Sequence, residues 1–169
     1  MVKVYLDCDG VILDTINRSY QILKEQGKNT EEERKEFYSN INWKELIIES
    51  GEINNSIIKI NELSKYFDVE ILTHVYTDNE LHDKINYFNI VLPGINVIGV
   101  PKTMEKADFV DATGAVLVDD FSPNLDYWKE KGGIPVKFSM SDKEYVYPVI
   151  SDLLELIDLL NKNKVKVKE

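Results

Sequence analysis

The sequence is poor in residues and segments that support several large classes of protein. Its single cysteine, Cys8, cannot form an internal disulfide, which agrees with a reducing compartment. Its apolar runs are far too short to span a bilayer. The N-terminus shows no basic segment followed by a long apolar stretch and a small-residue cleavage site. We therefore expect a cytoplasmic protein with no membrane partner.

Positive charge is scarce relative to negative charge. The chain has 20 Lys and Arg residues against 30 Asp and Glu residues, a formal net charge of −10. Such a surface opposes the phosphate backbone of a long DNA or RNA, so we do not expect a long nucleic acid as partner. A small phosphorylated metabolite is compatible with this charge, because a few local cations can bind it while distant charges are screened.

The residues that are present belong to an ordinary globular chain. Its 169 residues suit one domain with a small insertion, and 43% of them are hydrophobic. Short runs rich in β-branched residues alternate with helix-like stretches, which predicts a three-layer α/β sandwich around a mostly parallel, Rossmann-like sheet. The expected strands are Val2–Leu6, Val69–Leu72, Asn96–Val100, Ala115–Val118 and Ile134–Phe138.

Helix signals fill most intervals between these strands. Thr77 precedes Leu81, Ile85 and Phe88 at helical spacing, and Ser122-Pro123 supplies a helix start with proline in the first turn. After Pro148, one apolar stripe predicts a core-facing helix made by Val149, Ile150, Leu153, Leu154, Ile157 and Leu160.

The segment 15–63 interrupts the alternation, because it places two or three expected helices between the first and second strands. Thr30-Glu31-Glu32-Glu33 within it matches a capping box. We interpret residues 15–63 as a small helical cap, and residues 1–14 and 64–169 as the core domain.

Polar side chains follow four of the expected strands directly. Ligands of parallel sheets bind at the carboxyl ends of the strands, so these side chains should share one site. The first strand leads into Asp7-Cys8-Asp9, the second into Thr73, the third into Pro101-Lys102 and the fourth into Asp119-Asp120.

Asp7 and Asp9 can act on one substrate, because residues i and i+2 of an extended chain point the same way. Carboxylates gathered closely repel one another unless they are protonated or share a cation, and an all-oxygen site suits Mg²⁺. Asp119 and Asp120 would supply further oxygen ligands. Such a cation would also neutralise a phosphate dianion and let an anionic nucleophile approach it.

This ordered set resembles the four motifs of the haloacid dehalogenase (HAD) superfamily of phosphohydrolases. The resemblance lies in Asp-x-Asp-Gly-Val at the first strand, Ile71-Leu72-Thr73-His74, Lys102, and Leu117-Val118-Asp119-Asp120. It implies a HAD-like fold, with Asp7 as the nucleophile that forms an aspartyl-phosphate. It also implies that Asp9 protonates the leaving oxygen and later activates water, the feature that separates the superfamily's phosphatases and phosphomutases from its dehalogenases and ATPases.

The same resemblance assigns the ligands. It implies that Thr73 and Lys102 hold the transferring phosphoryl group. Mg²⁺ would be bound by Asp7, the backbone carbonyl of Asp9, and one or both of Asp119 and Asp120.

Lys106 competes with Lys102 for this role, since it lies one helical turn further on. We prefer Lys102 because it follows the strand directly, and because Pro101-Lys102-Thr103 with Ala107-Asp108 resembles the deoxyribonucleotidases. Lys106 is then expected to be a solvated helix residue, and Cys8 a small core side chain.

The narrower resemblance is to the 5′(3′)-deoxyribonucleotidases, through the insertion after the first motif and the stretch Asp119–Leu125. It implies a nucleoside monophosphate as substrate. Phe37, Tyr38 and Trp43 of the expected cap could stack on the base or simply hold the cap together, and His74 could line the pocket.

Two other functions fit the same residues. One is a phosphatase of another small metabolite, such as a sugar phosphate. The other is a non-enzymatic phosphoacceptor like the receiver domains of response regulators, which also gather acidic residues, a threonine and a lysine. The order of motifs argues against a receiver. Receivers carry an acidic pair after the first strand and the acceptor aspartate after the third, whereas here Asp-x-Asp follows the first strand and the adjacent pair Asp119-Asp120 follows the fourth.

Overall fold

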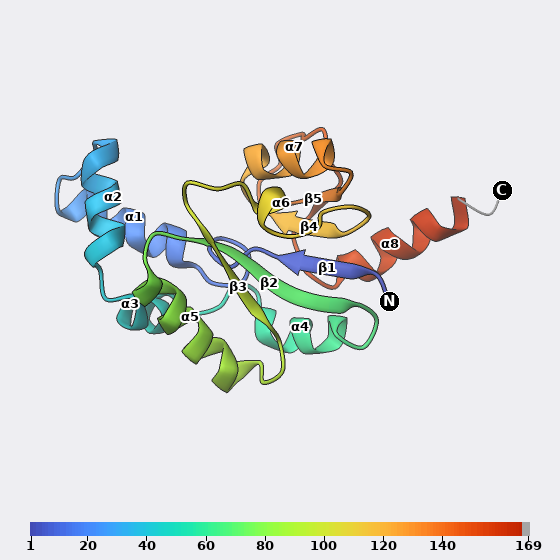
Figure 1. Ribbon diagram of the computed structural model, residues 1–169, viewed down its shortest axis with the longest axis horizontal. Helices are drawn as coiled ribbons and strands as arrows, with labels where there is room; N and C mark the ends of the chain where they lie inside the picture. The colour runs from blue at the N-terminus through green and yellow to red at the C-terminus, as the bar shows by residue number, and fades with distance from the viewer. Residues whose placement is uncertain (167–169) are drawn as a thin grey trace.

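The computed structural model describes residues 1–166, and a six-stranded parallel sheet forms its centre (Figure 1). The order across the sheet is β3-β2-β1-β4-β5-β6. The strands are β1 (Lys3–Leu6), β2 (Asp68–Val75), β3 (Val97–Pro101), β4 (Val116–Asp119), β5 (Ile134–Phe138) and β6 (Val149–Ile150). All five expected strands are present, and the predicted parallel α/β sandwich is confirmed.

Eight helices are present in the described part of the chain. They are α1 (Thr15–Glu25), α2 (Glu31–Asn40), α3 (Trp43–Ser50), α4 (Ser56–Leu63), α5 (Asp78–Val91), α6 (Lys106–Phe109), α7 (Ser122–Glu130) and α8 (Glu155–Lys166). Figure 1 shows α6 and α7 on one side of the sheet and α4 and α5 on the other. Helix α8 packs in the same core as α4 and α5, through Leu156 and Leu160. No described helix is both long and apolar enough to cross a membrane.

The alternation of side chains along β1 explains the two cores. Val4 and Leu6 point to the face covered by α4, α5 and α8, and Tyr5 points to the opposite face. On that second face Tyr5 meets Trp128 of α7 edge to face, with ring centroids 5.5 Å apart. Because β1 lies between β2 and β4 and is buried on both faces, the residues that follow it are held by the most constrained part of the fold.

Four helices, α1 to α4, separate β1 from β2. The first three share a small core of their own, which Leu23, Phe37, Tyr38, Trp43 and Leu46 form. The capping box at Thr30 is present, with reciprocal bonds between Thr30 and Glu33. By contrast, Ile60 and Leu63 of α4 belong to the main core below the sheet. The cap as a separate unit of residues 15–63 stays a prediction.

One expected helix start is wrong. Val149 and Ile150 form the edge strand β6, because they pair with β5, and α8 begins only at Glu155. Leu154, expected in the core, is exposed, while Leu156 is buried in its place. The helix start at Ser122-Pro123 is confirmed, since α7 begins at Ser122 with proline in its first turn. The N-cap residue is Phe121, and the Ser122 hydroxyl accepts a hydrogen bond from Lys137.

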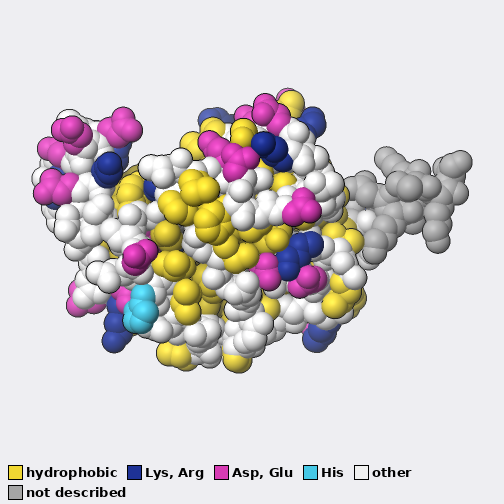
Figure 2. Space-filling model, in the orientation of Figure 1, with side chains coloured by type: hydrophobic (Ala, Val, Ile, Leu, Met, Phe, Trp, Pro, Cys, Tyr) yellow, Lys and Arg dark blue, Asp and Glu magenta, His cyan; other side chains and the backbone are white. Residues whose placement is uncertain are grey.

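Charge is unevenly spread over the surface. Figure 2 shows Asp and Glu side chains gathered at the outer end of α2, and hydrophobic side chains over the middle of the same face. Glu31 and Glu32 in the first turn of α2 are exposed, which suits the positive end of the helix dipole.

Candidate active site

Three neighbouring strands deliver the acidic residues to one edge of the sheet. Asp7 follows β1 at once, Asp119 ends β4, and Thr73 lies near the end of β2. The register aligns Leu6 with Ile71 on one side and with Val118 on the other, so Asp7 and Asp119 reach the same level and Thr73 lies one residue further along β2. The expectation that these side chains meet at the carboxyl edge is therefore met.

Asp7, Asp119 and Asp120 form a compact carboxylate cluster. Their ligand oxygens all lie within 4.8 Å of one another. Asp119 is fully buried and Asp7 nearly so. Burial and the neighbouring Asp119 charge raise the pKa of Asp7 to about 8, and the same two causes raise the pKa of Asp120 to about 6. Three crowded oxygen donors of this kind fit Mg²⁺, because a divalent cation would favour their ionised forms.

Gly10 is needed for this cluster to close. Its φ is +83°, a conformation that side chains rarely adopt, and a Cβ atom placed on it would lie 2.3 Å from Asp120 Oδ2. The glycine after the Asp-x-Asp pair therefore lets the backbone pass directly beneath the Asp120 carboxylate.

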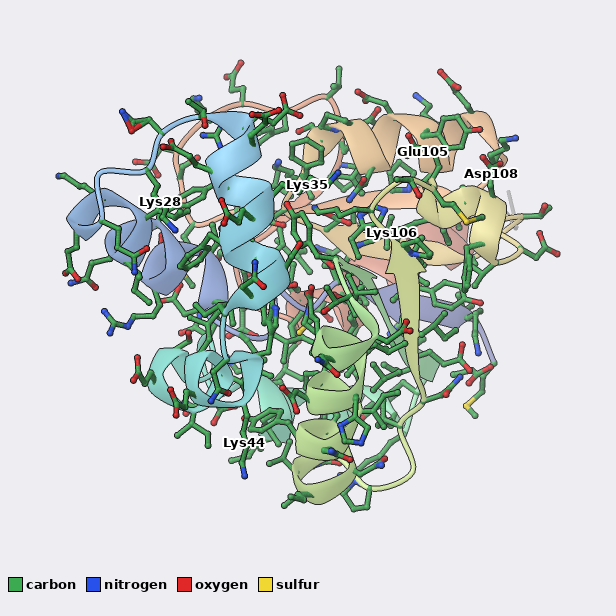
Figure 3. All side chains as sticks on the ribbon, turned by 60° about the vertical axis from the view of Figure 1, so that its left-hand side comes forward. Lys28, Lys35, Lys44, Glu105, Lys106 and Asp108 are labelled. Carbon is green, nitrogen blue, oxygen red and sulfur yellow. The ribbon has the colours of Figure 1, made fainter. Side chains whose placement is uncertain are left out.

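The lysine inside the cluster is Lys106, so the expectation that Lys106 is solvated is wrong. Its Nζ donates hydrogen bonds of 2.8 Å to Asp7 Oδ1 and 2.7 Å to Asp119 Oδ2. The side chain is 2% exposed, since α6 begins at Lys106 and turns it inward to the ends of β1 and β4. In Figure 3 Lys106 lies below Glu105 and Asp108 and far from Lys44, which is exposed on α3.

Lys102 lies at the rim of the site. It is exposed, and its Nζ lies 5.3 Å from the centre of the Tyr76 ring. It lines the cavity described below but has no hydrogen bond to the carboxylates among the described residues. Lys102 follows β3 directly in sequence but does not reach the carboxylates. Residues 102–105 are exposed, and the chain returns to the site only at Lys106, where α6 begins.

Asp9 stands apart from the carboxylate cluster and has its own partners. Thr15 Oγ1 donates a 2.6 Å hydrogen bond to Asp9 Oδ1, and Lys84 Nζ donates one of 2.6 Å to Asp9 Oδ2. Burial by itself would raise the pKa of Asp9, but the Lys84 ammonium lowers it below its usual value. Sequence reasoning missed Lys84; its signal was the Glu80–Lys84 pair at i and i+4 on the stripe that ends in Phe88.

A cavity of about 600 Å³ opens above these residues. Asp7, Asp9 and Asp120 lie at its floor, and Thr73, fully buried, contacts Asp9 Oδ2 at 3.4 Å. The remaining wall is formed by aromatic and polar residues that include Tyr20, Tyr38, Trp43, His74, Tyr76, Asn124, Asp126 and Tyr127. The volume suits a small metabolite.

The residues expected to form the substrate pocket divide between two places. Tyr38 and Trp43 line the cavity, and their rings stack with centroids 6.1 Å apart. Phe37 does not line it, but faces a second cavity of about 690 Å³ between α1, α2 and α3. His74 lines the main cavity, and its Nε2 lies 2.9 Å from the Met104 carbonyl oxygen. Burial and the nearby Lys106 charge lower the pKa of His74 to about 4, so the ring is neutral.

Cys8 is confirmed as a core side chain. It is fully buried and belongs to the main core below the sheet. Burial and the Asp9 charge hold the pKa of its thiol well above the ordinary value, so the thiol is unreactive.

Comparison with known proteins identifies the fold. No protein-family model and no curated protein matches the chain. The HAD-hydrolase YfnB from Bacillus subtilis, solved with magnesium, has a similar structure, with a TM-score of 0.64 at 16% identity over 95% of this chain and 98% of that one. A haloacid dehalogenase-like hydrolase from Xanthomonas campestris has a TM-score of 0.64 at 9% identity, over 100% and 95% of the two chains.

A phosphatase of bisphosphorylated sugars is also similar. D,D-heptose 1,7-bisphosphate phosphatase from Burkholderia thailandensis has a TM-score of 0.57 at 16% identity, over 95% of this chain and 99% of that one. Together these similarities show that the chain has the fold of HAD-superfamily hydrolases. The narrower resemblance to the 5′(3′)-deoxyribonucleotidases stays a prediction.

Proposed function

We propose that this protein is a magnesium-dependent phosphomonoesterase that works through an aspartyl-phosphate on Asp7. The observation that carries the proposal is that one cavity is lined by carboxyl groups in two different environments. Asp7 lies with Asp119 and Asp120 in a cluster suited to a cation, while Asp9 lies outside that cluster and is held separately. Two carboxyl groups in different environments are suited to two different tasks.

The reaction would follow from these positions. A carboxylate oxygen of Asp7 attacks phosphorus as the bond to the leaving oxygen breaks. Asp9 must take up a proton before this step, because, against the effect of burial, the Lys84 ammonium lowers its pKa, and it then gives that proton to the leaving oxygen. Asp9 then takes a proton from a water molecule, which attacks the phosphorus of the aspartyl-phosphate. Inorganic phosphate leaves and the Asp7 carboxylate is restored, so the protons balance over the cycle.

Mg²⁺ would be held by Asp7 and by one or both of Asp119 and Asp120, with the backbone carbonyl of Asp9 as a further ligand. Bound there, it would neutralise the phosphate dianion. Asp119 is already oriented for this role, because the Phe121 backbone N–H donates to its Oδ1 and Asn124 Nδ2 to its Oδ2.

Lys106 is the better candidate for the lysine that holds the transferring phosphoryl group. Its ammonium lies against Asp7, where an incoming phosphoryl oxygen must arrive. Thr73, beside Asp9, would donate from the other side. Lys102, at the rim beside Tyr76, is better placed to meet the leaving group or a second charged group of the substrate.

For the substrate we propose a nucleoside monophosphate. The support is the aromatic wall of the cavity, in which Tyr38 stacks on Tyr76 at 5.1 Å with an interplanar angle of 13°. A planar base could extend this stack, an interaction worth about 1–3 kcal/mol in nucleic-acid complexes. The acidic outer end of α2 (Figure 2) would disfavour a long nucleic acid at the same place.

A sugar phosphate is the second candidate. It is favoured by the polar part of the wall, where Asn124, Asp126 and Glu130 offer hydrogen-bond partners for hydroxyl groups. The structural similarity to a heptose bisphosphate phosphatase points the same way.

Phosphate release from a panel of phosphomonoesters with Mg²⁺ tests the proposal. We expect nucleoside monophosphates to be hydrolysed faster than sugar phosphates, and the Asp7→Asn variant to lose at least ~1000-fold in kcat. Asp142→Asn, an exposed aspartate outside the cavity, is the matched control and should keep wild-type activity. Full activity in Asp7→Asn would sink the mechanism, and a phospho-enzyme that persists for minutes in the wild type would favour the phosphoacceptor.

A further inference from the structure

A buried lysine, Lys84 of α5, lies directly beneath Asp9. Its side chain is fully buried, and its Nζ donates hydrogen bonds of 2.6 Å to Asp9 Oδ2 and 2.7 Å to Glu80 Oε1. A third bond of 3.1 Å goes to Thr73 Oγ1. One ammonium group therefore joins the proposed acid, the proposed phosphate-binding hydroxyl and a second buried carboxylate.

The position of Lys84 is fixed from its own helix as well as by Asp9. Glu80 and Lys84 lie one turn apart on the buried stripe of α5. Glu80 is anchored in turn, because the Tyr76 backbone N–H donates a 2.7 Å bond to its Oε2 and its own N–H donates to Thr77 Oγ1. A lysine and a glutamate are rarely buried unless both are paired, and here every donor direction of the ammonium meets an oxygen.

Asp9 is consequently held from two sides. Thr15 at the start of α1 binds Oδ1, and Lys84 of α5 binds Oδ2, so rotation of the carboxyl group would break one bond or the other. The centre of the Trp43 ring lies 4.7 Å from Lys84 Nζ, which brings α3 into the same arrangement.

We propose that Lys84, anchored by Glu80, is a positioning residue that holds the Asp9 carboxyl group where it can pass a proton to the leaving oxygen. The inference rests on the proposed function, since it assigns Asp9 that step. It adds a residue that lies in none of the four motifs. Misplacement of a reacting group by about 1 Å can cost 100-fold in rate, so an anchor of this kind matters for the chemistry as well as for packing.

The experiment compares two esters in the same protein preparation. An alkyl phosphate has a poor leaving group that needs the proton, whereas p-nitrophenyl phosphate releases an acidic phenol that hardly needs it. We expect Lys84→Met to lower kcat for the alkyl ester by about 100-fold and for the aryl ester by less than about tenfold, with little change in KM. Lys84→Arg should recover most of the loss, because it restores a cation beside Asp9.

The double variant tests whether Lys84 acts through Asp9. In an Asp9→Asn background, Lys84→Met should change the first-turnover rate ratio of the two esters by less than about threefold, since the group it positions is absent. If Lys84→Met folds poorly, Lys84→Met/Glu80→Gln removes the unpaired glutamate charge and should show the same selectivity. Lys59→Met removes a partly buried ion pair with Asp152 outside the cavity, and should leave the ratio unchanged.

Equal losses for both esters, or an undiminished effect in the Asp9→Asn background, would overturn the positioning role. A crystal structure of Lys84→Met supplies a readout that needs no activity. We expect the Asp9 carboxyl group to leave Thr73 while Asp7, Asp119 and Asp120 keep their places; an unmoved Asp9 contradicts the inference. Wild-type protein that hydrolyses neither ester would instead contradict the proposed function, and the crystal structure would still decide the role of Lys84.

Discussion

Lys106 and Asp7 are joined by a 2.8 Å hydrogen bond across 99 positions of sequence. The bond ties the short helix α6 to the end of the central strand β1. Lys106 also bonds Asp119, so one ammonium lies between two of the three carboxylates of the cluster. The fold therefore brings opposite charges together at the carboxyl ends of β1 and β4.

The two candidate lysines can be separated by matched substitutions. Lys106→Met should lower kcat/KM by about 100- to 1000-fold, the usual loss when a donor to the transition state is removed. Lys102→Met should cost less than about tenfold, since an exposed cation contributes little. Steady-state phosphate release by both variants, with circular dichroism to confirm folding, checks this. A larger loss in Lys102→Met would return the phosphate-binding role to Lys102.

The requirement for Mg²⁺ should depend on pH. The pKa values of Asp7 and Asp120 are raised to about 8 and about 6, so protons compete with the cation for these carboxylates. As the pH falls from 8 to 6, the Mg²⁺ concentration for half-maximal activity should rise. EDTA should abolish activity and excess Mg²⁺ restore it. A half-saturating concentration that does not change over this range would contradict the assignment of these ligands.

Asp120 can be tested on its own. Asp120→Asn keeps the shape of the side chain but removes its charge, and should raise the half-saturating Mg²⁺ concentration by at least about tenfold. Asp126→Asn is a suitable control, because Asp126 also lines the cavity but lies outside the carboxylate cluster. The same increase in both variants would indicate a general effect of charge and not a ligand.

Gly10→Ala should be more damaging than its size suggests. The added methyl group would meet the Asp120 carboxylate at 2.3 Å, and the positive φ would be strained in addition. We expect loss of Mg²⁺-dependent activity together with a lower melting temperature. Gly27→Ala has a positive φ but open space around it, so it should share only the loss of stability. Wild-type activity in Gly10→Ala would show that the Asp120 loop can move away without consequence.

The aromatic wall predicts substrate selectivity. Tyr76→Leu removes the ring that stacks on Tyr38, and should raise KM for a nucleoside monophosphate by about tenfold. KM for a sugar phosphate should change much less. Kinetics with both substrates decide between the two candidate classes: equal effects would show that the stack only holds α2 against the end of β2.

Much of this site could be predicted from the sequence because its parts follow strands directly. Asp7, Thr73 and Asp119 are positioned by β1, β2 and β4, and a buried strand leaves little freedom at its carboxyl end. Lys106 could not be placed in this way. Its position depends on the path of residues 102–105 between β3 and α6, and no local sequence pattern specifies that path.

Lys84 was missed for a different reason. The helix pattern Leu81, Ile85 and Phe88 predicted an apolar stripe, whereas the buried stripe is Glu80, Lys84 and Phe88. A charged pair can be buried in that stripe only because Asp9 and Thr73 lie opposite it. Asp9 follows β1 and Thr73 lies in β2, so both partners come from outside α5. Val149 and Ile150 were likewise expected in a helix from their local pattern. They form a strand because they pair with β5, which the local sequence does not reveal.

The most direct test of the whole account is to trap the phosphoryl group. The Asp9→Asn variant, which lacks the group that activates water, would be mixed with substrate and Mg²⁺, quenched in acid and digested for mass spectrometry. The account predicts one added phosphoryl group on the peptide that contains Asp7, and none when Asp7 is also replaced by Asn. Hydrolysis by the wild type without any phosphorylated Asp7 peptide in the variant would contradict it.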